Sequence, residues 1–166
     1  PVWPFVLAGV LVVSNVTFLV HARSLTREHQ PRATTGNLWA QIVTDLLVLT
    51  ALVHFAGSLE TYITFAYLFH IVLACIFFSR LQGLAVTIFA SGLYAACVAA
   101  EVTGLVKPAG IYADPGIREA MARRPTVLVL SVTSAGTIWL VVWFLASHLS
   151  ALVRERDHHL DEVNRR

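Results

Sequence analysis

Three ionisable side chains stand out inside the long apolar stretches of the sequence: Asp45, His70 and Glu101. An ionisable group in hydrocarbon costs about 2.5–3.5 kcal/mol on insertion scales, so each one is expected to have a partner or a function. A carboxyl group can take up and release a proton, and an imidazole can do the same or bind a metal ion or haem iron. These positions are therefore the first candidates for a sensing or binding site.

Asp45 lies near the middle of the second apolar stretch, one helical turn after Gln41. Residues i and i+4 share a helix face, so Asp45 can bond to Gln41 or to Asn15 of the first apolar stretch. Two interpretations stay open. The three side chains hold helices together through polar contacts, each worth about 0.6–2 kcal/mol, or they form a buried switch that responds to protonation or to a ligand.

Five residues are candidates for sensing or for binding a ligand or cofactor: His54, Tyr67, His70, Tyr94 and Glu101. All of them except Tyr67, which shares a helix face with His70, are placed in the outer half of the predicted bundle and could line one pocket. His70 is the best candidate for a metal ligand, and haem b, a quinone or a metal ion could bind beside it. Ordinary packing of His70 is the alternative. His70 should lie about 8–10 Å deeper than His54, which makes the imidazoles of one chain a poor pair of haem ligands.

Two other features limit the sites that can form. Asp45 and His54 are nine residues apart. That distance is about two and a half helical turns, so they point to opposite faces of their helix and belong to separate sites. The two cysteines, Cys75 and Cys97, both lie inside apolar stretches, and we expect them to be core residues.

The composition predicts the elements that position these residues. The chain has 166 residues, of which 57% are hydrophobic and 13% charged, which excludes an ordinary soluble domain and a disordered chain. The apolar stretches have the length that crosses a hydrocarbon core of about 30 Å as a helix. We predict an all-α, polytopic bundle of five transmembrane helices over residues 2–20, 38–56, 63–78, 84–102 and 126–148. The net charge of +2 gives no indication of nucleic-acid binding.

The positions of Lys and Arg predict the orientation of the bundle. Eight of the twelve basic residues fall on one side, which we predict to be cytoplasmic: Arg23, Arg27, Arg32, Arg80, Arg154, Arg156, Arg165 and Arg166. The other four, Lys107, Arg118, Arg123 and Arg124, lie in the loop 104–125, which alternation places outside. Residues 117–122 of this loop could form one short interfacial turn of helix. The C-terminus is therefore expected in the cytoplasm.

The segment after the fifth apolar stretch contains neither Pro nor Gly and continues that stretch as a helix. Val153, Arg156, Leu160 and Val163 occupy alternating seam positions of a short coiled coil. We therefore divide the chain into a transmembrane sensor bundle, residues 1–148, and the start of a cytoplasmic signalling helix, residues 149–166. A plain solvated helical tail is the alternative.

Several short motifs spread over most of the chain carry a family resemblance. They are Gln41-x-x-x-Asp45-Leu46-x-x-Leu49-Thr50, His54-Phe55-Ala56-Gly57-x-x-Glu60, Phe69-His70-Ile71, Glu101-x-x-Gly104 and the charged tail from Leu152 to Arg165. Together they resemble the membrane sensor region of bacterial two-component histidine kinases of the six-span, redox-sensor-like type. The outer loop departs from the family pattern, because Gly57-Ser58 replaces Gly-Gly and Thr61-Tyr62 replaces Asn-Pro.

The resemblance implies a homodimer in the bacterial inner membrane, a further span before residue 1, a cytoplasmic kinase core after residue 166 and a response regulator as partner. The chain has no phospho-acceptor or ATP-binding motif, so it contains no predicted catalytic residue. The parent protein would be an ATP-dependent protein-histidine kinase. In the fifth stretch, Ser131, Ser134 and Gly136 form a small-residue patch that could serve a dimer contact or packing within one chain.

Two other classes of function stay open. The chain could be a cofactor-bearing membrane protein that holds haem b or a quinone, or a small transporter or a subunit of a membrane complex. Transport would favour broken helices and several midplane charges, whereas Asp45 is the one charge that we place at the midplane.

Overall fold

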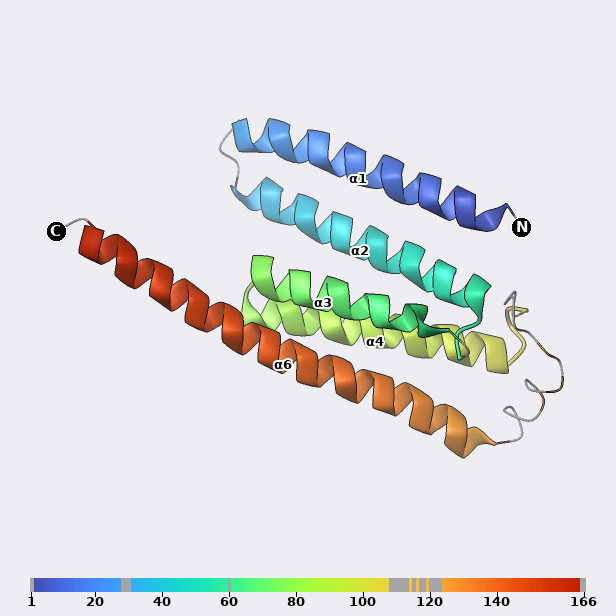
Figure 1. Cartoon of the computed structure of the whole chain (residues 1–166). Helices are drawn as coiled ribbons and strands as arrows, with labels where there is room; N and C mark the ends of the chain where they lie inside the picture. Colours follow the sequence, from blue (N-terminus) through green and yellow to red (C-terminus); the bar gives the residue numbers. More distant parts are fainter. Residues whose placement is uncertain are drawn as a thin grey trace. The chain divides into compact units, whose positions relative to one another are not determined.

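The computed structural model describes residues 2–27, 31–59, 61–107, 114, 116, 119 and 124–164. Within this part of the chain every regular element is a helix and no strand occurs, which confirms the all-α prediction. The helices, in chain order, are α1 (Trp3–Arg27), α2 (Pro31–Ala56), the 3-10 helix η1 (Tyr62–Phe65), α3 (Ala66–Phe77), α4 (Arg80–Val102) and α6 (Pro125–Asn164) (Figure 1).

Four helices are long and apolar enough to cross a membrane, over Phe5–Ser24, Ala33–Ala56, Arg80–Val102 and Pro125–Arg156. They match four of the five predicted spans. The third predicted span is helical but shorter, because it consists of the 4 residues of η1 and the 12 residues of α3. At the rise of 3-10 and α-helices this segment is about 26 Å long, slightly less than a hydrocarbon core of about 30 Å.

Helix boundaries follow from the local sequence. α2 and α6 begin at Pro31 and Pro125, because proline fits the first helical position, where no backbone donor is needed. α4 begins with a reciprocal capping box: Gln82 N–H donates to Ser79 Oγ at 3.4 Å, and Ser79 N–H donates to Gln82 Oε1 at 3.1 Å. This cap explains why α4 follows α3 after only two residues.

The first compact unit comprises Pro1–Thr64 and Cys97–Ala113. Within it α1 and α2 form a hairpin and pack along their length (Figure 1). Near the connection of the two helices, the buried Asn37 donates from Nδ2 to the Phe18 carbonyl at 3.2 Å. At the other end of the hairpin, the Trp3 ring stacks on Phe55 with centroids 5.2 Å apart. Contacts at both ends therefore fix the register of α1 on α2.

The second compact unit comprises Phe65–Ala96 and Asp114–Arg166. Its core is an aromatic cluster of Tyr67, Tyr94 and Trp139, all buried. The Trp139 ring lies 4.9 Å from Tyr67 and 5.5 Å from Tyr94, measured between centroids. α3 and α6 pack against each other in this unit.

Gly136 of the small-residue patch faces α4, since a Cβ added there would lie 4.0 Å from Ser91 Oγ. Gly136 therefore packs within the chain, and a dimer contact through the patch stays a prediction.

α6 is one helix of 40 residues that runs through the predicted boundary at residues 148 and 149 without interruption. The expected continuity of span and tail is thus observed in the backbone. The side chains of Val153 and Arg156 are exposed, and those of Leu160 and Val163 lie outside the described part, so the coiled coil stays a prediction. Most of the predicted interfacial turn, residues 117–122, also lies outside the described residues.

Candidate functional site

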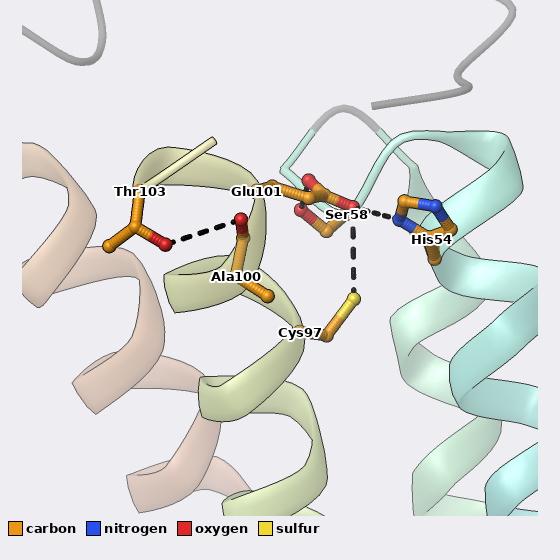
Figure 2. Close-up of polar contacts among 6 residues, drawn as sticks. All are labelled: His54, Ser58, Cys97, Ala100, Glu101 and Thr103. Carbon is orange, nitrogen blue, oxygen red and sulfur yellow. Dashed lines mark hydrogen bonds and ion pairs between the residues drawn. The ribbon is translucent and has the colours of Figure 1, made fainter. Parts of the chain in front are cut away.

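Four side chains of the first unit meet where α2 and α4 end, and we call them the polar cluster: His54, Ser58, Cys97 and Glu101 (Figure 2). Glu101 is the centre of the polar cluster. Its Oε1 lies 2.7 Å from His54 Nδ1 and accepts from Cys97 Sγ at 3.7 Å, and its Oε2 accepts from Ser58 Oγ at 2.5 Å. One carboxyl group therefore has three polar neighbours.

Two glycine caps place the polar cluster. Gly57 and Gly104 have positive φ angles of 100° and 74°, a conformation that glycine adopts without steric cost. Each glycine follows a cluster residue by three positions and bonds back to it. Gly57 N–H donates to the His54 carbonyl at 3.3 Å, and Gly104 N–H donates to the Glu101 carbonyl at 3.2 Å. His54 and Glu101 thus both lie in the last turn of a glycine-capped helix.

The same caps explain how Ser58 and Cys97 join the polar cluster. The chain reverses at Gly57, and Ser58, which is 2% exposed, turns its hydroxyl to Glu101. Cys97 lies four residues before Glu101 on α4, on the same helix face. From the sequence we expect Cys97 to be a core residue, and no motif points to Ser58. The i,i+4 spacing of Cys97 and Glu101 was the signal that could have identified the cysteine.

The electrostatics of this place favour positive charge. A helix C-terminus carries a partial negative charge, and a cation near it is stabilised by about 0.3–1 kcal/mol at exposed positions. His54 and Glu101 have side chains that are 17% and 9% exposed, so solvent screens their interaction only in part. The polar cluster therefore lies at two helix ends whose partial negative charge attracts a group that brings positive charge to it.

The predicted partners of Asp45 form a second network, in which Asn15 occupies the middle position. Gln41 Nε2 donates to Asn15 Oδ1 at 2.7 Å, and Asn15 Nδ2 donates to Asp45 Oδ1 at 3.2 Å. Asn15 Nδ2 also donates to the Leu11 carbonyl at 3.0 Å. The two bonds between side chains connect α1 to α2, and neither of them involves a residue of the polar cluster. That Asp45 and His54 belong to separate sites stays a prediction.

His70, Tyr67 and Tyr94, which we had grouped with His54 and Glu101, belong to the second unit. His70 Nδ1 lies 3.1 Å from the Ala66 carbonyl one turn earlier, and its ring meets Phe69 edge-on. Tyr67 and Tyr94 pack their rings in the aromatic cluster. Within the described residues, the group of side chains that could hold a metal ion is His54, Cys97 and Glu101, which does not include His70.

A third set of contacts, which we call the exit contact, joins α6 to the turn between α3 and α4. Its members are Cys75, Phe78, Arg80, Trp143, Ser147 and Arg154. Ser147 Oγ donates to Cys75 Sγ at 3.4 Å, and Trp143 Nε1 donates to the Arg80 carbonyl at 3.2 Å. The Arg80 guanidinium lies 5.6 Å from the centre of the Trp143 ring. The exit contact lies where the apolar part of α6 gives way to Arg154, Glu155 and Arg156.

Comparison with known protein families, with curated proteins and with solved structures finds no match to this chain.

Proposed function

We propose that the chain is the membrane-embedded input module of a two-component sensor histidine kinase. It senses a cue in the bilayer or at the outer face and passes the signal through α6 to a cytoplasmic kinase core. The module works as a homodimer in the bacterial inner membrane, with its C-terminus in the cytoplasm, and the kinase acts on a response regulator. The motifs that resemble redox-sensor-like kinases support this assignment.

The observation that carries the proposal is the continuity of α6. Its 40 residues include an apolar segment long enough to cross a membrane and a charged segment beyond it. Neither a proline nor a glycine follows Gly136 in this helix, so the later part contains no sequence cause for a kink. A rotation or shift of the apolar part of α6 is therefore transmitted along the same helix to its charged part.

The exit contact connects α6 to α3 and to the start of α4, near the point where α6 becomes charged. Arg154 Nη1 donates to the Phe78 carbonyl at 3.3 Å, which ties the first charged turn of α6 to the C-terminal cap of α3. Cys75 and Ser147, both buried, connect the same two helices one to two turns earlier. A movement of α3 is therefore transmitted to α6 at the point where that helix becomes polar.

The register of α6 tests this proposal. Inserting one or two residues between Leu149 and Val153 rotates everything beyond by about 100° per residue, whereas seven inserted residues restore the helix face to within about 20°. We expect one- and two-residue insertions to change autophosphorylation of the intact kinase in membranes, and the seven-residue insertion to retain it. Equal activity of all three variants and the parent protein would contradict the proposal.

A further inference from the structure

We propose that His54, Cys97 and Glu101 bind a divalent transition-metal ion of the zinc type, with Ser58 holding the carboxylate in place. Each of the three residues offers one ligand atom, and these atoms lie within 4.8 Å of one another. The proposal is independent of the signalling role of α6, because it depends only on the geometry of the polar cluster within the first unit.

Two of the three ligand-atom distances in the polar cluster can be compared directly with those of a tetrahedral site. Zinc binds nitrogen, oxygen and sulfur at about 2.0–2.3 Å, so its ligand atoms lie about 3.3–3.6 Å from one another. The Cys97 Sγ to Glu101 Oε1 distance is 3.7 Å. The His54 Nδ1 to Glu101 Oε1 distance is 2.7 Å, because a proton now lies between them, and it has to widen by about 0.6 Å.

The ligand set selects the class of metal. A thiolate and an imidazole suit zinc and neighbouring transition metals, whereas magnesium and calcium prefer oxygen ligands alone. Three protein ligands leave one tetrahedral position open, which is the arrangement of zinc sites that exchange water or another ligand. The bound ion is therefore expected to keep one exchangeable ligand, such as water.

Charge balance favours the ion in this partly buried place. On binding, the Cys97 thiol loses its proton to solvent, and the proton between His54 Nδ1 and Glu101 Oε1 moves to Nε2 or to solvent. The imidazole is then neutral with its proton at Nε2, and Nδ1 is free to bind the metal. One thiolate, one carboxylate and one divalent cation then sum to zero charge. The negative ends of α2 and α4 add to the attraction for the cation.

Ser58 has the role of an orienting residue. Its hydroxyl donates to Glu101 Oε2, so the other oxygen of the carboxylate, Oε1, is left on the side of His54 and Cys97. Hydrogen bonds of this kind fix the rotamer of a metal-binding carboxylate, and their removal weakens metal affinity by about 10–100-fold. Ser58→Ala should therefore weaken binding within that range without abolishing it.

The chain contains two cysteines, so a sulfur-to-cobalt band in a cobalt titration can be assigned to one of two residues. We expect Co²⁺ added to the purified, reduced full chain to produce a sulfur-to-cobalt charge-transfer band that saturates at one ion per chain and disappears on addition of Zn²⁺. Cys97→Ser and His54→Ala should abolish the band. The matched controls Cys75→Ser and His70→Ala should retain it. A band that survives in Cys97→Ser, or no band in the parent chain, would overturn the proposal.

A second measurement keeps the proposal testable if Cys97→Ser or His54→Ala folds poorly. In the Cys75→Ser chain, Cys97 is the one remaining thiol, and its alkylation by a maleimide can be followed with and without Zn²⁺. We expect Zn²⁺ to slow alkylation at least tenfold, and Glu101→Gln to remove this protection while leaving the rate without metal similar. Equal alkylation rates with and without Zn²⁺ would show that the polar cluster only joins the ends of α2 and α4 through hydrogen bonds and binds no metal. Neither measurement depends on kinase output.

Discussion

Asn15 connects the polar contacts between α1 and α2. Its amide group donates to the Leu11 carbonyl and to Asp45, and accepts from Gln41. Both hydrogens of the amide nitrogen are thus accounted for, as is one lone pair of its oxygen. A polar group in an apolar span that loses its partner costs about 1–3 kcal/mol, so this residue should matter more for stability than its partial exposure suggests.

We expect Asn15→Leu to lower the free energy of unfolding by about 1–3 kcal/mol, because Gln41 and Asp45 each lose one partner. Thermal unfolding of the purified chain in detergent measures this change. Thr17→Ala is the control, since the Thr17 hydroxyl is exposed and bonds to the Val13 carbonyl of its own helix. If Asn15→Leu were as stable as the control Thr17→Ala, the contacts of Asn15 with Gln41 and Asp45 would contribute nothing to stability.

Gly57 and Gly104 act at the scale of whole helices, because they end α2 and α4 and direct His54 and Glu101 to the same place. Both have φ angles in the left-handed region, which costs other L-residues about 1–2 kcal/mol. The chain also offers a helix-interior glycine without this constraint. Nothing lies within 4 Å of a Cβ added at Gly92.

Alanine at Gly57 or Gly104 should therefore destabilise the chain by about 1–2 kcal/mol. Alanine at Gly92 should be neutral or stabilising by up to about 1 kcal/mol, because alanine favours helix interiors. Thermal unfolding of the three single variants under identical detergent conditions compares them directly. If all three glycines tolerated alanine equally, the caps would not be what positions the polar cluster.

The helices could be predicted from the sequence because their length and apolar composition are local properties. The contact of Asn15 with Asp45 was one of two alternatives that the sequence offered. The i,i+4 spacing of Gln41 and Asp45 indicated that these two side chains share one face of α2. The polar cluster could be predicted only in part. His54 and Glu101 were candidates, but the contact of Ser58 with Glu101 depends on the chain reversal at Gly57 and on the packing of α2 near α4, neither of which has a periodic signal.

At the scale of the molecule, large apolar side chains remain exposed on α1 and α6. On α1 the side chains of Val6 and Val13 are 57% and 66% exposed, and on α6 those of Leu130 and Leu145 are 67% and 60% exposed. A soluble monomer rarely leaves such extended apolar surface in water. Lipid contact explains these faces together with the length of the helices, and a partner chain could cover part of them.

The predicted orientation can be tested by labelling in intact cells. In a background of Cys75→Ser and Cys97→Ser, a membrane-impermeant maleimide should label Leu105→Cys from outside. It should label Glu155→Cys only after the membrane is permeabilised. Both positions are exposed, so a difference in rate reports the side of the membrane. Labelling of Glu155→Cys in intact cells would invert the topology, and with it the assignment of the tail to the cytoplasm.

The length of α6 has a mechanical consequence. Forty residues at 1.5 Å per residue make a rod about 60 Å long. If the end at Pro125 stayed in place, a tilt of about 5° would displace the far end sideways by about 5 Å, which is close to the pitch of one helical turn. Because the exit contact ties this helix to α3, such a tilt has to carry α3 with it. A change in bilayer thickness or lateral pressure that moves both helices together could therefore appear at Asn164 as a displacement large enough to re-register a neighbouring helix.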